Sequence, residues 1–306
     1  MPVNHERGIA LIVVLALVAL ISTWAVTAAY EDMIALRRAE NMVASAKAHL
    51  ASESAMNLAR LGLREDARLG GVDDLTEQWA QEAPPFPVDG GMLSGQIIDM
   101  NRLINLNDLV DDQGGVHPTQ VVIVKRLFTL LELDPSLVDA LCDWLDSDQE
   151  STGAMGAEDS AYYAQDYRVK NARLDHLNEL LLVKGFDRKT FEKLSPFVGV
   201  WPIEAGALSP ININTASPQV LQALFPNMLD ADAMGVVDGR PYDSLTLLQQ
   251  QPWALGDAGA NFVRLTVSSG YFRVQTDALF DRSHCREVYI LQRMGTAVTV
   301  IERMEL

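Results

Sequence analysis

The stretch of this chain with the clearest chemical potential is rich in carboxylates and has no basic residue. Between Arg126 and Arg168 no Lys, Arg or His occurs, whereas ten carboxylates do. These are Glu132, Asp134, Asp139, Asp143, Asp146, Asp148, Glu150, Glu158, Asp159 and Asp166. The densest part, Asp143 to Tyr163, contains Gly153 and Gly156 and lacks a helix or strand period, so we expect a loop. Hard cations such as calcium take about six to eight oxygen ligands from carboxylates and loop carbonyls.

The candidate ligands lie within this loop. The run Asp146-x-Asp148-x-Glu150 matches the first alternating ligands of an EF-hand, but Ser151 stands where that motif needs glycine. The site is therefore not an EF-hand. The metal ligands that we expect are Asp146, Asp148, Glu150, Glu158 and Asp159, with carbonyls of residues 151–156 completing the shell. An all-oxygen set disfavours zinc and copper, and magnesium keeps more of its waters, so calcium is the expected ion. The alternative is a solvated acidic loop without metal.

Cysteine and histidine suggest little chemistry. Cys142 lies in a predicted helix and Cys285 beside a predicted strand. They would form a disulfide in an oxidising compartment if they were close enough, and two free thiols are the alternative. His284 adjoins Cys285, but neighbours in a strand point to opposite faces. The remaining histidines show no metal spacing: His5, His49, His117 and His176. Without a phosphate loop, nucleophile elbow or zinc-protease helix, we expect a protein that is not an enzyme.

Two short motifs share an alternating apolar and asparagine pattern, Ile104-Asn105-Leu106-Asn107 and Ile211-Asn212-Ile213-Asn214. The second opens INTASPQVLQAL, which resembles the start of a helix-hairpin-helix, a DNA-binding element of some membrane-anchored uptake proteins. That element needs a glycine-rich hairpin, whereas residues 225–228 here have no glycine and acidic residues follow. A net charge of −17 also argues against nucleic acid as a partner. We therefore expect turn and capping asparagines, and keep a membrane-anchored DNA-uptake protein as the alternative function.

The elements around these motifs begin with a long helix. Ile9 to Ala29 runs without a charge, and at about 1.5 Å per residue it spans roughly 30 Å, one hydrocarbon core. From Ile9 to Leu61 there is no glycine or proline, and Glu31 to Arg60 consists mostly of good helix formers. We expect one helix of about 50 residues, apolar in its first half and amphipathic in its second. An ordinary signal peptide cleaved after Ala28 or Ala29 is the alternative.

Downstream of this helix, breaks are expected at Gly70-Gly71 and at 84–87, followed by a strand over 93–100. Helices are then expected over 119–132, 135–145, 174–183, 188–194 and 218–225, and strands over 262–275, 287–293 and 297–304. The fold class is α+β, a long N-terminal helix plus an antiparallel sheet, with a large α-helical domain inserted in it. We expect a leader (1–8), a transmembrane segment (9–29), the α+β frame (30–100 and 260–306) and the inserted domain (101–259).

A short polar leader, Gly8 and an uninterrupted apolar helix resemble the start of type IV pilins and pseudopilins. The resemblance implies that prepilin peptidase cuts between Gly8 and Ile9 and that Ile9 is then N-methylated. The mature chain would keep 298 of the 306 residues. Members of the family usually have glutamate at the fifth mature position, where this chain has Val13. The K-class minor pseudopilin of type II secretion lacks that glutamate and is unusually long, so the chain looks like this class.

The K-class resemblance carries further expectations. It implies a pilin-like frame, calcium in the helical domain near a GAED-type segment, here 156–159, and a place at the pseudopilus tip. It implies I-class and J-class minor pseudopilins as partners, a single-pass anchor in the inner membrane and the bulk of the chain in the periplasm. Function would lie in pseudopilus assembly and in export of folded proteins across the outer membrane. Met42, Ala46 and Leu50 form the apolar stripe that we expect to pack against partner helices.

Overall fold

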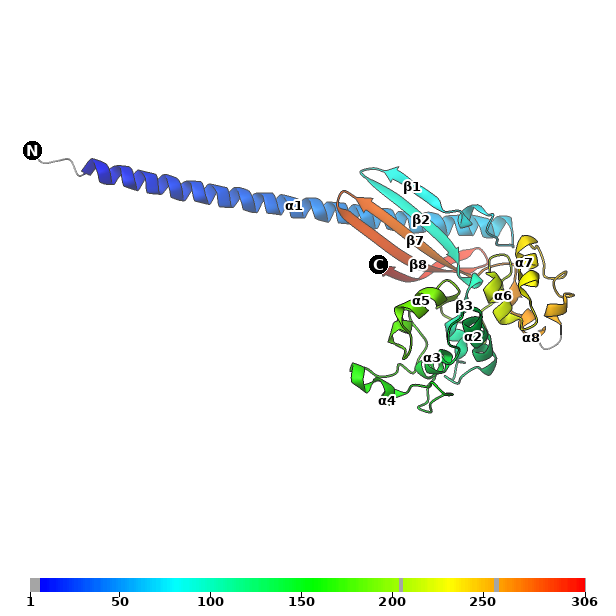
Figure 1. Cartoon of the computed structure of the whole chain (residues 1–306). Helices are drawn as coiled ribbons and strands as arrows, with labels where there is room; N and C mark the ends of the chain where they lie inside the picture. Colours follow the sequence, from blue (N-terminus) through cyan, green and yellow to red (C-terminus); the bar gives the residue numbers. More distant parts are fainter. Residues whose placement is uncertain (1–5, 204–205, 256–258, 306) are drawn as a thin grey trace, which may run out of the picture.

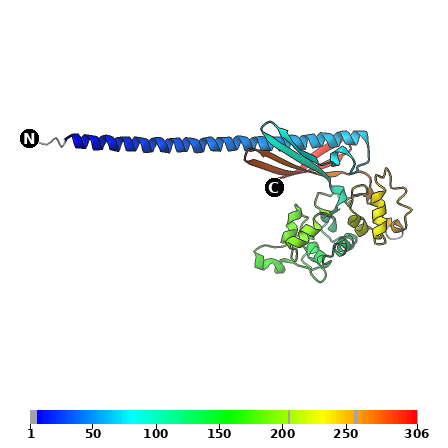
Figure 2. The ribbon, with the colours of Figure 1, turned by 45° about the horizontal axis from the view of Figure 1, so that its top comes forward.

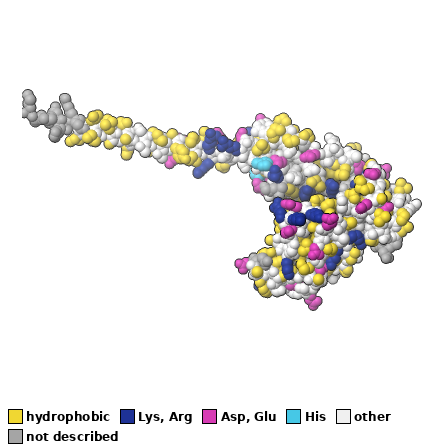
Figure 3. All heavy atoms as spheres, in the orientation of Figure 1, with side chains coloured by type: hydrophobic (Ala, Val, Ile, Leu, Met, Phe, Trp, Pro, Cys, Tyr) yellow, Lys and Arg dark blue, Asp and Glu magenta, His cyan; other side chains and the backbone are white. Residues whose placement is uncertain are grey.

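The computed structural model describes residues 6–203, 206–255 and 259–305. Its first element is one continuous helix, α1 (Glu6–Leu69), which at about 1.5 Å per residue is roughly 95 Å long (Figure 1). The single helix is confirmed, and it continues past Leu61 through Gly62 to end at Leu69, where the N–H of the following Gly70 donates to Asp66 O. The apolar first part of α1 is long enough to cross a membrane, and none of it is buried. Figure 3 shows hydrophobic side chains along this part.

A five-stranded antiparallel sheet packs against the second half of α1 (Figures 1 and 2). Its strand order is β1-β2-β7-β8-β9. The strands are β1 (Ala83–Val88), β2 (Gly91–Asp99), β7 (Tyr271–Phe280), β8 (Ser283–Met294) and β9 (Ala297–Glu305). The register between β2 and β7 runs from the pair Gly91–Phe280 to the pair Asp99–Phe272, so strands far apart in sequence are neighbours. Gly295 forms the turn between β8 and β9 with a positive φ of 58°.

The expected break at 84–87 is wrong. These residues form β1, despite prolines at positions 84, 85 and 87. Proline has no N–H to donate, so within a sheet it is confined mainly to edge strands. Here β1 is an edge strand that pairs only with β2. The prolines therefore close this edge of the sheet to further pairing rather than preventing a strand.

One face of α1 is buried on the sheet. Ala44, Ala48, Ser52 and Met56 recur at intervals of four residues, which places them along one side of a helix. The small side chains let the sheet approach closely, and larger ones fill the space toward the end of α1. Trp79 stacks edge-on against Phe272 there, with ring centroids 5.3 Å apart. This buried face holds α1 and the sheet together as one frame.

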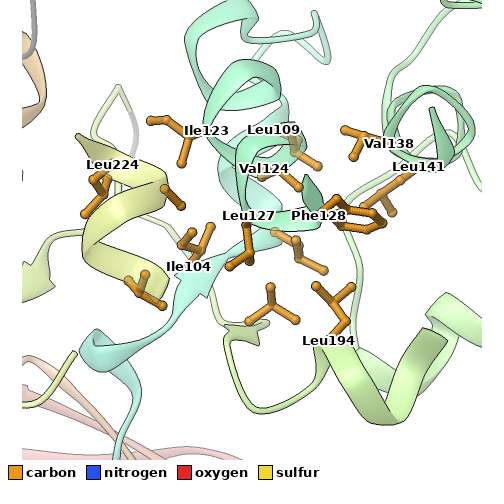
Figure 4. Close-up of a cluster of buried hydrophobic side chains, with 14 of the residues drawn as sticks. Ile104, Leu109, Ile123, Val124, Leu127, Phe128, Val138, Leu141, Leu194 and Leu224 are labelled. Atoms are coloured by element: carbon orange, nitrogen blue, oxygen red, sulfur yellow. The ribbon is translucent and has the colours of Figure 1, made fainter. Parts of the chain in front are cut away.

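The inserted domain lies between β2 and β7, at the end of α1 opposite the N-terminus (Figure 1). Its helices are α2 (Pro118–Leu130), α3 (Leu137–Leu145), α4 (Asp159–Tyr162), α5 (Arg188–Leu194), α6 (Pro218–Leu224), α7 (Asp230–Asp238) and α8 (Gly259–Phe262). Two short parallel strand pairs accompany them: β3 (Ile104–Asn105) with β4 (Val198–Gly199), and β5 (Ile211–Asn212) with β6 (Leu265–Thr266). The apolar side chains of α2, α3, α5 and α6 meet in one core (Figure 4).

Three expectations for this domain need correction. The helix expected over 174–183 is a shorter 3-10 helix, Leu177–Leu182. Residues 262–267 belong to the insertion, because α8 ends there and β6 pairs with β5. The sheet resumes only at Tyr271, about ten residues later than expected. Helix α7 was not predicted, because its hydrophobic pattern is weak and its first turn is acidic.

The two asparagine motifs have equivalent structures. The side chains of Asn105 and Asn212 each accept a hydrogen bond from the backbone N–H two residues later, at 3.1 and 2.9 Å. Asn107 exchanges two hydrogen bonds with the backbone of Leu174, and Asn214 does the same with Tyr242. The expected turn role is confirmed. Each motif also fastens a distant loop to the core, so the insertion consists of two halves that begin alike.

Candidate metal centre

The acidic loop begins where α3 ends. Asp139, Asp143 and Asp146 follow one another at intervals of four and three residues, so they share one face of α3 and its C-terminus. The loop then runs to Glu158, which directly precedes α4. Asp143 was counted both with the expected helix over 135–145 and with the expected loop, and it belongs to the helix. A helix end and a helix start thus position the carboxylates.

Two of these carboxylates hold the loop backbone. Asp143 accepts hydrogen bonds from Thr152 N at 2.8 Å and Ala157 N at 2.6 Å, so both of its oxygens are engaged. Asp139 accepts one from Ala154 N at 3.1 Å and pairs with Lys125 at 2.6 Å. This role of Asp139 and Asp143 was not expected from the sequence. The four-residue spacing in a predicted helix was the available signal.

Two glycines allow the loop backbone to pass close to the carboxylates of Asp139 and Asp143. A Cβ at Gly153 would lie 2.3 Å from Asp139 Oδ2, and the residue has a φ of +60°. At Gly156 a Cβ would lie 2.7 Å from Asp143 Oδ2. Both positions need a residue without a side chain, because the backbone approaches the carboxylates directly.

Three carboxylates remain free to bind a cation. One oxygen each from Asp146, Asp148 and Glu158 lie within 4.8 Å of one another. Asp146 Oδ1 and both carboxylate oxygens of Glu158 are buried and have no hydrogen-bond partner. Buried polar atoms are nearly always satisfied, so these three oxygens have acceptor capacity that a cation could use. The donor set, all carboxylate oxygen, fits a hard divalent cation.

The electrostatics of the group agree with its geometry. Burial, with the charges of Asp148 and Asp143, raises the pKa of Asp146 to about 6. Burial and four neighbouring carboxylates likewise raise the pKa of Glu158 to about 7. Both shifts report negative charge that no basic side chain offsets.

Of the five expected ligands, the structure therefore brings three together. Glu150 is exposed, and its N–H donates to Asp148 Oδ1 at 2.7 Å. Asp159 turns away and accepts a hydrogen bond from Val169 N at 3.2 Å. Neither belongs to the group formed by Asp146, Asp148 and Glu158.

The other singled-out residues lie elsewhere. Cys142 and Cys285 are free thiols in separate cores, so the structure has the alternative without a disulfide. Gly8 and Ile9 lie in the first turns of α1, and residues 1–5 of the expected leader fall outside the described residues. Helices α6 and α7 do pack together, but their connection has no glycine and α7 begins with Asp230.

Two further clusters of potential metal ligands occur among the described residues. In one, Arg293 pairs with Asp66 and Asp73, so a guanidinium already occupies the place of a cation beside Glu77. The other joins His49, Cys285 and Glu287. His49 thus lies near two potential ligands in space, although the histidines show no metal spacing along the sequence.

Together, the frame and the acidic loop define a class: a pilin-like protein with an N-terminal helix that could cross a membrane and an inserted α-helical domain. Two family models, both described as type II secretion system (T2SS), protein K, match residues 102–203 and 211–267. Type II secretion system protein K of Pseudomonas aeruginosa is 34% identical, over 90% of this chain and 86% of the relative. The protein of the same name from Pectobacterium carotovorum is 31% identical, over 98% and 96%. The chain belongs to the family of type II secretion system protein K.

The fold has a solved counterpart. A chain of the GspK-GspI-GspJ complex from the type 2 secretion system of enterotoxigenic Escherichia coli matches with a TM-score of 0.76. The match covers 88% of this chain and 99% of that chain at 24% identity. The expected α+β fold with a long N-terminal helix is confirmed. The two family matches begin at or just before the two asparagine motifs, which agrees with the two halves of the insertion.

Proposed function

We propose that this chain is the minor pseudopilin that caps the pseudopilus tip and acts in pseudopilus assembly and in export of folded proteins across the outer membrane. The observation that carries the proposal is the position of the insertion, which lies beside the sheet and extends past the end of α1 farthest from the apolar segment (Figures 1 and 2). A subunit stacked above it would clash with this bulk. Val13 also supports a position at the tip. It stands where the family usually has a glutamate, so this chain lacks the intramembrane carboxylate that would contact a further subunit.

The apolar start of α1 suggests how the chain is processed and anchored. We propose that prepilin peptidase cuts between Gly8 and Ile9, that Ile9 is N-methylated, and that residues 9–29 cross the inner membrane once. The rest of the chain would then lie in the periplasm. N-terminal sequencing of protein extracted from membranes tests this, with Ile9 as the expected first residue. A chain that begins at Ala28 or Ala29 would instead indicate an ordinary signal peptide.

The exposed stripe of α1 suggests where partners bind. Met42, Ala46 and Leu50 lie on the side of the helix opposite Ala44 and Ala48, which pack on the sheet. Met42 is 73% and Leu50 64% exposed, so the frame leaves this stripe uncovered. A helix of this kind gains stability by burying its apolar stripe. We propose I-class and J-class minor pseudopilins as the partners, as in the complex of the similar solved chain.

Leu50→Glu tests the stripe. We expect it to weaken association with the co-expressed I-class and J-class chains by at least about tenfold, because burying a leucine contributes about 1.5–3 kcal/mol. Leu247→Glu is the matched control, since Leu247 is 74% exposed but lies in the inserted domain. Co-purification of the full chains from membranes is the measurement. Equal recovery of partners with both variants would contradict the proposed surface.

We also propose that Asp146, Asp148 and Glu158 hold a structural calcium ion. When bound, the ion would offset the charge of these carboxylates and link the end of α3 to the start of α4. The unpartnered oxygens of Asp146 and Glu158 support this proposal. The role of the ion would be structural. Loop carbonyls and water would complete the shell, since calcium takes about six to eight oxygens.

The calcium proposal is tested with the double variant Asp146→Asn/Glu158→Gln, which keeps side-chain shape. We expect calorimetric titration to detect calcium binding by the original chain and none by the variant. At about 100 times the dissociation constant, calcium should stabilise the original chain by about 2.7 kcal/mol. Asp166→Asn is the control, because it removes one charge from the same segment outside the group. An unchanged melting temperature in chelator and no titration heat would leave a solvated acidic loop.

A further inference from the structure

A second cluster of potential metal ligands lies where α1 crosses β8, far from the acidic loop. It joins His49 of α1 to Cys285 and Glu287 of β8. Cys285 Sγ lies 3.2 Å from His49 Nδ1, which lies 3.4 Å from Glu287 Oε1, and the three atoms are all within 4.8 Å of one another. Cys285 and Glu287 are two residues apart in a strand, so their side chains point to the same face. That face is the one covered by α1.

These distances are close to the edges of a zinc coordination tetrahedron. With bonds of about 2.0–2.3 Å to nitrogen, oxygen and sulfur, two tetrahedral ligands lie roughly 3.3–3.7 Å apart. Thiolate and imidazole are ligands that zinc and other borderline metals prefer, in contrast to the all-oxygen set of the acidic loop. The simpler alternative is a hydrogen bond between thiol and imidazole without a metal.

The surroundings orient the ligands in the way metal sites require. The second carboxylate oxygen of Glu287 accepts hydrogen bonds from Ser52 and Tyr289, which fix its orientation. Arg303 donates to Oε1 through Nε and Nη2 and lies over the Tyr289 ring, so a metal ion would have to use the remaining lone pair of Oε1 or displace this guanidinium, which is 52% exposed.

Access for a fourth ligand is also present. Cys285 is buried, whereas the side chain of His49 is 38% exposed. Water can therefore reach the cluster from the side of α1. Three protein ligands and one water make a complete tetrahedral shell.

We propose that His49, Cys285 and Glu287 form a zinc-type metal site that fastens α1 to the sheet. Binding releases the Cys285 thiol proton to solvent and forms a bond from sulfur to the metal. The site is separate from the proposed calcium centre in place and in ligand type. The bound metal would add a direct link between α1 and β8, which are far apart in the sequence.

Cobalt(II) is the probe, because it replaces zinc and its spectrum reports thiolate bonding. The full chain in detergent, kept reduced and with calcium present, is titrated with cobalt. We expect a charge-transfer band in the near ultraviolet and visible bands of a tetrahedral ion, saturating at one equivalent and abolished by zinc. Cys285→Ser and His49→Gln should each lose these bands.

His284→Gln is the matched control. His284 adjoins Cys285 but pairs with Asp277 at 2.6 Å, away from the cluster. This variant and the double variant Asp146→Asn/Glu158→Gln should keep the bands. Circular dichroism confirms that each variant is folded, and if Cys285→Ser fails to fold, His49→Gln decides. A titration without a charge-transfer band, or with a band that survives both Cys285→Ser and His49→Gln, would overturn the proposal.

Discussion

At the scale of single residues, the buried ion pair between Arg264 and Asp108 links the two ends of the inserted domain. Arg264 Nη2 lies 2.8 Å from Asp108 Oδ2, and the same guanidinium donates to Gln120 Oε1 and Ser209 O. Burial raises the pKa of Asp108 and lowers that of Arg264, so each charge depends on the other. The pair joins residues 156 positions apart in the chain.

Arg264→Ala should therefore destabilise the chain by about 3–5 kcal/mol, because it leaves the charge of Asp108 buried and unpaired. Arg188→Ala is the control, since Arg188 pairs with Glu192 on an exposed helix face. Its loss should cost about 0–1 kcal/mol. Urea unfolding followed by tryptophan fluorescence measures both. Similar losses for the two variants would contradict a structural role for the buried pair.

Sequence could predict residues of the site only where they are neighbours in the chain. Asp146, Asp148 and Glu158 lie within one loop, so their local density identified them. Glu150 and Asp159 are carboxylates of the same segment, but the direction of a side chain in a loop or at the first residue of a short helix such as α4 is not encoded locally. His49 and Cys285 are 236 positions apart, and only the packing of α1 on β8 brings them together. A pattern of residue spacing along the sequence cannot predict a contact between residues this far apart.

At the scale of elements, α1 was predictable because helix formation depends on local propensity and period. The strand β1 was not, since its prolines are acceptable only at an edge, and the edge is set by the whole sheet. Helix boundaries in the insertion shifted by a few residues for the same reason. The asparagine motifs were correctly assigned to turns, yet their second role, fastening loops at Leu174 and Tyr242, depends on tertiary contact.

Gly62 tests the continuity of α1. It lies inside the helix, and a Cβ there would meet nothing within 4 Å. Gly62→Ala should stabilise the chain by about 0.5–1 kcal/mol, because glycine is a poor helix residue. Gly91→Ala should destabilise it, since a Cβ at Gly91 would lie 2.5 Å from Leu279 O. Thermal unfolding measures both, and a melting temperature lowered by Gly62→Ala would contradict a continuous helix.

Asp99 joins the sheet to the insertion. Its side chain accepts hydrogen bonds from Thr215 at 2.5 Å and Ser269 at 2.8 Å. Burial nevertheless raises its pKa to about 6, against those hydrogen bonds. Because the folded chain holds this proton more tightly than the unfolded chain, the contribution of Asp99 to stability falls as pH rises from about 4 to 6.

The predicted fall in the contribution of Asp99 to stability can be measured by urea unfolding across pH 4 to 8 at constant calcium. The original chain should lose stability relative to Asp99→Asn between about pH 4 and 6, and the difference should then be constant. The variant is the appropriate comparison because it removes the titrating group and keeps its shape. Parallel stability curves would show that Asp99 does not titrate in this range.

At the scale of the whole molecule, the chain consists of a long helix with an apolar first part, a pilin-like frame, and a bulky domain that lies beside this frame and extends past the end of α1. The frame buries one face of α1 and leaves the stripe of Met42, Ala46 and Leu50 exposed. The proposed calcium and zinc-type sites would stabilise the insertion and the frame separately. This arrangement suits a subunit that binds laterally to partner helices and ends a filament.

The most direct test of this account is native mass spectrometry of the full chain, purified in detergent from membranes with its I-class and J-class partners. The account predicts one complex that holds a single copy of the chain, processed to 298 of its 306 residues and methylated at Ile9, with one copy of each partner. A chain that keeps its first eight residues, that is recovered without the partners, or that assembles mainly with copies of itself would contradict it.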